Sequence, residues 1–240
     1  MSKEVVQALC RQLRLGSQIA EIYGEIEARS HEEFLIKILT EALQIRQVER
    51  RKRYIQQAGF ELMKGFDDFD FAGITLPSGT TPDSLRACEF VLNKQNLILY
   101  GSPGTGKTHL AIALGLEACK RDCRVIYYKT SRLVNLLSEA RATQNEHKFW
   151  RKLEKADLLI LDEWGYIPFE RVGTQLLFEA ISDCYEKRSV MITTNLPFDE
   201  WNTIFYDQKL TAAILDRLVH HGKLILHDGQ SYRLKHSKMQ

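Results

Sequence analysis

One stretch, LILYGSPGTGKTHLAIAL from Leu97 to Leu114, constrains the fold of this chain more than any other. It joins a short apolar run, a glycine-rich loop ending in Lys-Thr, and a helical pattern of apolar residues. The loop matches GxxxxGK[ST] between a predicted strand and a predicted helix, which is the context that a phosphate-binding loop requires. Backbone N–H groups of such a loop and the helix N-terminus both direct positive dipoles at an anion. The sequence therefore predicts a nucleotide triphosphate site.

The loop residues have separate predicted roles toward ATP and Mg²⁺. Lys107 is expected to reach the β- and γ-phosphates as a point charge, and the Thr108 hydroxyl to coordinate Mg²⁺. The glycines allow the backbone to approach the phosphates closely. The residues predicted to bind the nucleotide in this loop are Gly101, Ser102, Pro103, Gly104, Thr105, Gly106, Lys107, Thr108 and His109.

Short β-rich apolar runs alternate with helical patterns through the chain beyond residue 65. The runs are LILY before the loop, RVIYY at 124–128, DLLIL at 157–161, SVMITT at 189–194 and KLILH at 223–227. This alternation predicts an α/β fold in which a five-stranded parallel sheet lies between helices.

Polar residues follow two of these runs directly. Asp162 is the predicted Mg²⁺ partner, and Glu163 is placed to orient and deprotonate a water in line with the γ-phosphate. Asn195 ends the fourth run, at the carboxyl edge where ligand sites gather in open α/β folds, and is expected to hold that water. The alternatives are solvated turn residues for the acidic pair and an ordinary turn residue for Asn195. Adjacent carboxylates downstream of a phosphate loop favour ATP hydrolysis.

The N-terminal part of the chain has a different pattern. From Lys3 to about Lys64 there is no proline, and apolar residues recur at helical spacing, so residues 1–65 are predicted to form a small helical domain for partner binding and assembly. The basic ERRKR run from Glu49 to Arg53, with the glycines and aromatic residues after it, suits a linker. Residues 66–240 are then the ATPase domain.

Composition bounds the class of protein. At 240 residues and 44% hydrophobic content the chain fits one medium domain with a small appendage. A net charge of +2 requires any nucleic-acid surface to come from local clustering. The five cysteines lack the paired spacing of a zinc site or disulfide framework. No apolar segment at the N-terminus is long enough for a signal peptide or membrane span, so we expect a cytoplasmic protein without a membrane partner.

The phosphate loop, the Asp162–Glu163 pair and Asn195 resemble Walker A, Walker B and sensor 1 of the AAA+ ATPases. Within that group, LILYGSPGTGKTHLAIALG, LLILDEWGY, TTNLPFDEW, LTAAILDRLVHHG and GQSYRLK resemble the IstB-type insertion-sequence helper ATPases, relatives of the DnaC helicase loaders. The resemblance runs along nearly the whole chain. It implies a homo-oligomer assembled through its ATP sites on duplex DNA, mostly without sequence specificity, which recruits and stimulates the transposase of the same element.

The resemblance also gives roles to two arginines. Arg217 stands where the family offers an arginine to the γ-phosphate of the neighbouring subunit, and the alternative is a surface arginine paired with an acid such as Asp216. Only about two dozen residues follow Arg217, too few for the C-terminal helical lid of general AAA+ proteins. Arg233 is then either a substitute for the second arginine sensor, acting in cis at the nucleotide, or an exposed strand-end arginine.

A basic segment follows the second predicted strand, where initiator-type AAA+ proteins carry a helical insertion that faces nucleic acid. Its lysines and arginines are expected to contact DNA phosphates without reading sequence. The alternative is a solvated amphipathic helix in which Phe149 and Trp150 belong to the core. The predicted DNA-binding residues are Lys129, Arg132, Arg141, Lys148, Arg151 and Lys152.

The sequence favours a DNA-transposition regulator over three other functions. A DnaC-like replicative helicase loader is a close alternative. The two functions differ in the partner of the N-terminal domain, which is a helicase for a loader and a transposase for a transposition regulator. A P-loop kinase for a small molecule has no need of Glu163 or Asn195, and a purely structural DNA-bending protein has no need of hydrolytic residues. Since no helix-turn-helix is evident, we expect DNA to be selected by shape and deformability.

Overall fold

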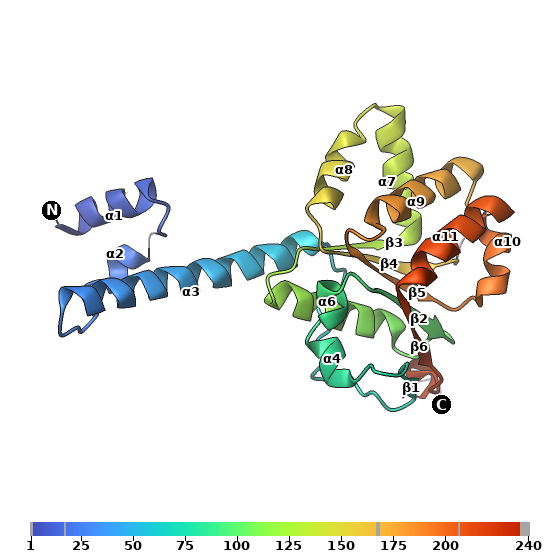
Figure 1. Cartoon of the computed structure of the whole chain (residues 1–240), viewed down its shortest axis with the longest axis horizontal. Helices are drawn as coiled ribbons and strands as arrows, with labels where there is room; N and C mark the ends of the chain where they lie inside the picture. The colour runs from blue at the N-terminus through green and yellow to red at the C-terminus, as the bar shows by residue number, and fades with distance from the viewer. Residues whose placement is uncertain (1, 17, 167–168, 206, 236–240) are drawn as a thin grey trace. The chain divides into compact units, whose positions relative to one another are not determined.

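The computed structural model describes residues 2–16, 18–166, 169–205 and 207–235 (Figure 1). The chain divides into two compact units, Met1–Arg53 and Tyr54–Gln240. The division lies inside a long helix, whereas the sequence places the domain boundary near Gly65. The role of residues 1–65 as a partner and assembly domain stays a prediction.

The first unit is helical. It contains α1 (Ser2–Gln12), α2 (Ile19–Ile22) and most of α3 (His31–Ala58). Its small apolar cluster is built around Cys10, Ile19 and Ala42. Many larger apolar side chains of α1 and α3 are exposed, among them Leu9, Leu39 and Leu43.

The prediction of a linker after the basic run is wrong for the residues that follow it. Helix α3 continues through ERRKR to Ala58, which is fully buried. Beyond the helix, Phe60, Phe66 and Phe69 pack against the core of the second unit. The glycines and acidic residues of this stretch suggested a solvated connection, but its aromatic rings bury enough apolar surface to fix it in place.

One six-stranded sheet forms the centre of the second unit, in the order β1-β6-β2-β5-β4-β3. The five predicted strands are β2 (Asn96–Gly101), β3 (Val125–Lys129), β4 (Leu158–Trp164), β5 (Ser189–Thr194) and β6 (Gly222–His227), and they pair in parallel. The sixth strand, β1 (Ile74–Thr75), pairs antiparallel with β6 and corrects the predicted count of five. Two residues are too few for a periodic pattern to reveal a strand.

Helices cover both faces of this sheet (Figure 1). They are α4 (Pro82–Arg86), α5 (Glu89–Leu92), α6 (Lys107–Lys120), α7 (Thr130–Ala142), α8 (His147–Glu154), α9 (Arg171–Cys184), the 3-10 helix η1 (Phe198–Trp201), α10 (Asn202–Phe205), α11 (Gln208–His220) and α12 (Tyr232–Lys235). None of the described helices combines the length and apolar character needed to cross a bilayer.

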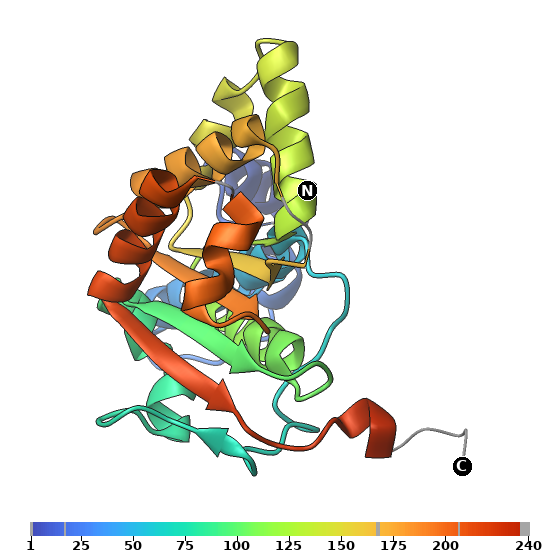
Figure 2. The ribbon, with the colours of Figure 1, turned by 90° about the vertical axis from the view of Figure 1, so that its right-hand side faces the viewer.

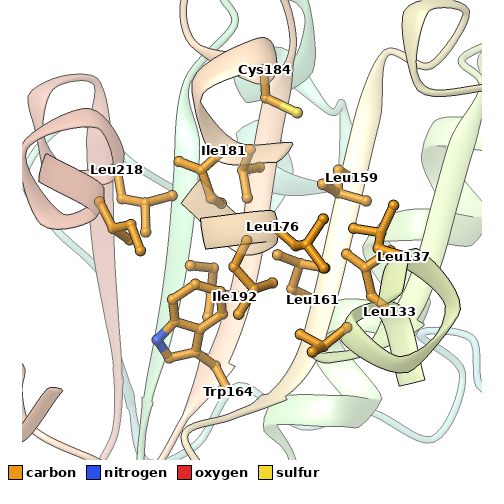
Figure 3. Close-up of a cluster of buried hydrophobic side chains, with 14 of the residues drawn as sticks. Leu133, Leu137, Leu159, Leu161, Trp164, Leu176, Ile181, Cys184, Ile192 and Leu218 are labelled. Atoms are coloured by element: carbon orange, nitrogen blue, oxygen red, sulfur yellow. The ribbon is translucent and has the colours of Figure 1, made fainter. Parts of the chain in front are cut away.

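The strands read as continuous apolar runs because both of their faces are buried. In β2, Ile98 points into one core, whereas Leu97 and Leu99 point into the other. The first core joins the sheet to α7, α8, α9, α10 and α11 and contains Leu133, Leu161, Trp164, Leu176 and Leu218 (Figure 3). The second joins it to α4, α5, α6 and the end of α3.

Strand β2 lies between β5 and β6, and the three run in the same direction (Figure 2). Their carboxyl ends therefore meet at one edge of the sheet, together with those of β3 and β4. In parallel sheets this edge is where ligands bind. The loop from β2 into α6, the end of β4 and the end of β5 all lie there.

Candidate nucleotide-binding site

The glycines of the phosphate loop are required by its conformation. Gly101, Gly104 and Gly106 have φ angles of +154°, +83° and +93°, in the region that favours glycine. A Cβ atom on Gly101 would overlap the carbonyl oxygen of His227 in β6, and one on Gly104 would overlap the Ser231 hydroxyl. The loop is thus enclosed by the end of β6 and by the residues after it.

The Lys107 side chain lies inside the loop. Its Nζ donates to the carbonyl oxygens of Gly101 at 2.6 Å and Ser102 at 2.8 Å. Burial lowers the pKa of Lys107 to about 8, and the positive charge of Arg233 adds to this. A buried ammonium gains most from an anionic partner, so the loop is suited to a phosphate.

The remaining loop residues hold this conformation. The Thr105 hydroxyl donates to the Ser102 carbonyl oxygen at 2.8 Å, and the Thr105 carbonyl oxygen lies 3.1 Å from Nδ1 of His227. His109 Nε2 lies 2.8 Å from the carbonyl oxygen of Gly65, which ties the first turn of α6 to the segment before β1. Ser102 and Pro103 are exposed at the tip of the loop.

Asp162 is buried at the end of β4 and receives hydrogen bonds from three hydroxyl groups. Thr108 donates to Oδ1 at 3.0 Å, Tyr127 donates to Oδ2 at 2.7 Å, and Thr193 also donates to Oδ1. The structure thus brings the two predicted Mg²⁺ ligands, Thr108 and Asp162, into contact. A carboxylate and a hydroxyl oxygen are donors of the type that Mg²⁺ prefers, so these residues fit the ion.

Glu163 follows in a β-bulge between β4 and β5, where the strand register shifts between Leu161 and Trp164. Its φ angle is +58°, and its N–H donates to the Thr193 hydroxyl at 3.0 Å. Bulges beside ligand sites redirect a side chain. Here the two adjacent carboxylates on either side of the bulge differ in exposure: Asp162 is buried and Glu163 is partly exposed.

The Glu163 carboxylate is paired with a lysine that the sequence assigned to DNA. Lys129 Nζ lies 3.1 Å from Oε1 of Glu163 and 3.5 Å from Oε2 of Glu61. The hydrogen bond to Glu163 raises the pKa of Lys129, so the ammonium form is favoured. In register, Lys129 of β3 is the direct neighbour of Asp162 in β4, which places it at the ligand edge of the sheet.

Asn195 directly follows β5 at the same edge, and its Oδ1 is buried without a hydrogen-bond partner among the described residues. Arg217, on α11, donates to the carbonyl oxygen of Ala213 at 2.9 Å and lies over the Phe178 ring at 4.8 Å. The contacts described for Arg217 do not include the phosphate loop. Arg233 is exposed on α12, and the preceding Tyr232 N–H donates to the Gly104 carbonyl oxygen at 3.0 Å.

The predicted DNA-binding residues divide into groups. Arg141 is bound by Glu146 at 2.5 Å and by Glu179 at 2.7 Å, which ties α7 to α8 and α9. Lys152 lies over the Tyr128 ring at 5.3 Å. Lys152 is exposed, as are Arg132, Lys148 and Arg151.

The aromatic residues of the basic segment belong to the core. Phe149 is buried in α8, and Trp150 packs partly buried against the same apolar cluster. The amphipathic-helix alternative therefore holds for these two rings, since both pack against the core cluster.

The sequence pattern did not point to several residues around the nucleotide site, and it assigned one of them, Lys129, to DNA instead. Tyr127 and Thr193 hold Asp162, Lys129 holds Glu163, and Ser231 encloses Gly104. A signal was present for the first three, because each is a polar residue near the carboxyl end of a β-rich run. The strand order, which makes β3 and β5 the neighbours of β4, was needed to use it.

The comparisons with known proteins agree with this site. Residues 12–240 match the family described as IstB-like ATP binding protein. An insertion-sequence ATP-binding protein of Sinorhizobium fredii is 39% identical over 83% of this chain and 67% of its own length. The ATP-binding protein of insertion sequence IS5376 from Geobacillus stearothermophilus is 32% identical over 99% of this chain and 97% of its own length.

A crystal structure of the DnaC helicase loader is similar in fold, with a TM-score of 0.52 and 21% identity over 73% of this chain and 99% of that chain. The family match covers most of the present chain, including every residue of the phosphate loop and of the acidic pair. This chain therefore belongs to the IstB-like ATP-binding proteins of insertion sequences, and its P-loop and parallel sheet are those of the AAA+ fold.

Proposed function

We propose that this chain is an Mg²⁺-dependent ATPase that regulates transposition, assembling on duplex DNA through its ATP sites and recruiting and stimulating the transposase of its element. The observation that carries the proposal is the meeting of Lys107, Thr108, Asp162 and Glu163 at one edge of the sheet. A protein that only binds a nucleotide needs the phosphate loop but no catalytic base. A second carboxylate beside the buried one gives the site a base for hydrolysis.

The geometry supports the following hydrolytic roles. Lys107 leaves the loop carbonyls for the β- and γ-phosphates of ATP, whose negative charge is the stronger partner for a buried ammonium. Thr108 and Asp162 would hold Mg²⁺, which supplies charge neutralisation at the phosphate oxygens. Glu163 takes the proton of the attacking water, and Asn195 Oδ1, which has no hydrogen-bond partner in the described part of the chain, accepts a hydrogen bond from it.

The site is completed by a second subunit. Arg217 is held in a fixed direction by Ala213 and Phe178 of its own chain. A guanidinium fixed in this way costs little entropy to place beside the γ-phosphate of a neighbour, where it stabilises the charge of the transition state. Bound ATP then holds two neighbouring subunits together before it is hydrolysed.

DNA is bound by the exposed cations of α7 and α8. Arg132, Lys148, Arg151 and Lys152 present positive charge there, and phosphate contacts of this kind are strongly salt-dependent and do not read sequence. An open hollow of about 450 Å³ lies beside these helices, with Lys148 and Lys152 at its border. The partner transposase is engaged by residues 1–65, whose exposed Leu39 and Leu43 lie on α3.

Two variants test the ATPase part of the proposal. Lys107→Ala should lose ATP binding, whereas Glu163→Gln should bind ATP, lose turnover and trap the protein on DNA. Nucleotide binding, phosphate release and DNA retention are measured for both. Undiminished hydrolysis by Glu163→Gln contradicts the assignment of Glu163 as the base. If Glu163→Gln loses both ATP binding and ATP hydrolysis, the substitution has damaged the fold.

A mixing experiment tests assembly. Arg217→Ala should bind ATP but not hydrolyse it, and Lys107→Ala supplies an arginine but no pocket, so a mixture should recover some hydrolysis at the hybrid interfaces. If the two variants co-assemble and stay inactive, Arg217 is not the residue acting in trans. Copurification of the chain with a replicative helicase instead of a transposase would favour a helicase loader.

A further inference from the structure

Two connections meet at the edge of the sheet opposite the nucleotide site. The first leads from α9 into β5 and contains Glu186, and the second leads from the end of α11 into β6 and contains His220 and His221. These residues therefore lie at the amino ends of β5 and β6, the two strands that pair with β2. None of the three has a role in the function proposed above.

The three side chains bring metal-binding atoms close together. The ligand atoms offered by Glu186, His220 and His221 all lie within 4.8 Å of one another. His221 Nε2 lies 3.5 Å from Glu186 Oε1, and the centroids of the two imidazole rings are 4.1 Å apart. Two imidazoles and one carboxylate are a donor set that Zn²⁺ binds, with its fourth position left to water. Imidazole nitrogen selects Zn²⁺, Cu²⁺ or Ni²⁺ over the hard cations Mg²⁺ and Ca²⁺.

The surroundings of this cluster favour a cation that arrives from solvent. The side chains of His221 and Glu186 have 42% and 61% of their surface accessible, so their contact contributes little to stability and is easily replaced. Helix α9 ends at Cys184 and α11 ends at His220, beside the cluster. The C-terminus of a helix carries the negative end of its dipole, which stabilises positive charge nearby.

Tyr185 fixes the direction of one of the imidazoles. Its hydroxyl lies 2.7 Å from Nδ1 of His220, and the two rings are close to parallel, at an interplanar angle of 24°. Metal-binding histidines are commonly held in this way by a hydrogen bond to a group that does not touch the metal. Tyr185 therefore acts as a positioning residue for His220.

Buried Asn96, the first residue of β2, holds the backbone of both connections. Its N–H donates to the carbonyl oxygen of His221 at 2.9 Å, and its Nδ2 donates to the carbonyl oxygen of Leu218 at 3.1 Å. Its Oδ1 accepts from the N–H of Val190, at the start of β5, at 2.9 Å. The segments that carry the ligands are thus fixed to the same strand before any ion binds, which is what a preorganised site requires.

Glu186 stands where the backbone favours a different residue. Its φ angle is +57°, in the left-handed region that glycine adopts most easily. In this conformation the N–H groups of Lys187 and Arg188 both donate to the carbonyl oxygen of Cys184, at 3.0 Å each. The turn would form equally well with glycine, so the carboxylate at this position is not needed to build it.

We propose that Glu186, His220 and His221 form a binding site for one divalent transition-metal ion, with Zn²⁺ as the ion that the donor set fits best. The bound ion joins the connection after α9 to the end of α11. The site lies at the edge of the sheet away from the phosphate loop, so this inference does not depend on the proposed ATPase.

The central test titrates the full chain with Zn²⁺ in the absence of nucleotide and follows binding by calorimetry and stability by thermal melting. Mg²⁺ in excess keeps Zn²⁺ from the oxygen donors of Thr108 and Asp162, and it competes poorly for imidazole. The wild-type chain should bind Zn²⁺ at this site and melt at a higher temperature when it is bound, since the ion binds the folded state. Binding that needs millimolar Zn²⁺ would indicate an adventitious ion only and would overturn the proposal.

Three variants separate the site from other metal-binding groups. Glu186→Gly should weaken Zn²⁺ binding at least about tenfold, yet it should not lower the melting temperature of the metal-free protein, because glycine suits the backbone there. Tyr185→Phe, which removes only the positioning hydroxyl, should weaken binding about tenfold. His147→Ala is the matched control, because His147 is an exposed histidine outside the cluster, and it should bind Zn²⁺ as the wild type does. Unchanged binding by Glu186→Gly, or an equal loss in His147→Ala, contradicts the site.

Cobalt identifies the ligands directly. Co²⁺ in place of Zn²⁺ should give the visible absorption of a site with nitrogen and oxygen donors, and His220→Ala should remove it. All five cysteines are buried, so no thiolate-to-cobalt band is expected. A thiolate band, or a spectrum that His220→Ala leaves unchanged, would assign the metal to other side chains and overturn the proposal.

Discussion

The phosphate-loop edge of the sheet and the basic face of α7 and α8 both depend on polar side chains, but they organise them differently. At the sheet edge, Lys107 and Asp162 are buried and each has two or more hydrogen-bond partners within the same unit. On the helices, Arg132 and Arg151 are exposed. One region is preorganised by the fold, and the other presents charge to solvent.

The difference teaches which changes each region tolerates. An unpaired buried polar group costs free energy of unfolding, so the sheet edge links function to stability. An exposed cation can be removed with little effect on the fold, so a substitution on the helix face is expected to change only the proposed DNA binding. Arg141 is the exception on the helix face, because its two acidic partners make it part of the scaffold.

The largest effect is expected from Gly101→Ala. The new Cβ would overlap the carbonyl oxygen of His227 in the neighbouring strand, and backbone at this position cannot move without disturbing β6. We expect a loss of about 3 kcal/mol or more in the free energy of unfolding, measured by urea denaturation, and loss of ATP binding. Gly79→Ala is the control, because Gly79 also has a positive φ of +75° but has no atom within 4 Å of its Cβ position. Equal losses in both variants would contradict the role of the contact.

The next effect is expected from Tyr127→Phe, which removes one of the three hydroxyl donors to Asp162. Burial and the nearby Asp162 raise the pKa of Tyr127, so the phenol stays protonated and donates. Loss of a hydrogen bond to a buried carboxylate should cost about 2 kcal/mol in chemical denaturation. Tyr128→Phe, which removes only an acceptor 3.4 Å from Lys152, should cost much less, and the reverse order would show that Asp162 does not depend on Tyr127.

A smaller effect is expected from pH on ATP binding. Because burial lowers the pKa of Lys107 to about 8, the ammonium form that binds phosphate is lost as pH rises through that value. Affinity should fall about tenfold between pH 7 and pH 9, measured with a fluorescent ATP analogue.

The stability of the nucleotide-free protein should change with pH in the opposite direction. The unfolded lysine has a pKa of 10.5, so between about 8 and 10.5 the unfolded state binds more protons and the contribution of Lys107 to stability rises with pH. Lys107→Arg is the control for the prediction on ATP affinity, because its guanidinium stays charged over this range. If the ATP affinity of this variant still falls between pH 7 and pH 9, deprotonation of Lys107 is not the cause of the fall.

The smallest changes in stability should distinguish two arginines of the helix face. Arg151→Glu should leave the free energy of unfolding within about 0.5 kcal/mol, while it weakens DNA binding and reduces its dependence on salt. Arg141→Glu should destabilise the protein, because it places a third carboxylate beside Glu146 and Glu179. Thermal melting and DNA titrations at several salt concentrations measure both. Identical profiles for the two variants would contradict the division of this face.

The parts of the fold that could be predicted from sequence depend on local pattern. Each apolar run of the parallel sheet reveals its own strand, and the spacing around Lys107 specifies a phosphate loop whatever the rest of the chain does. The end of α3 could not be predicted in this way, because a basic run followed by glycines looks the same in a solvated linker and on the exposed side of a helix. Strand β1 becomes recognisable as a strand through its pairing with β6.

The candidate site was predictable to the same extent. Asp162 and Glu163 were identifiable from their place after a buried run, and so was Asn195 after the next. The partners of Asp162 and Glu163 depend on which strands are neighbours, and no single segment contains that information. Lys129 and Arg141 were both expected to face DNA because they are basic, but ion pairs with Glu163 and Glu179 became visible only in three dimensions.

The strand order has a consequence for how the protein is made. Strand β2 carries the phosphate loop, yet its neighbours β5 and β6 leave the ribosome after β3 and β4. Pairings between segments distant in sequence form slowly, and a chain that emerges from its N-terminus must wait for them. The loop therefore gains its contact with His227 only after the whole segment from α6 to β6 has been synthesised. A truncated translation product would carry the phosphate-loop sequence intact without the wall that shapes it.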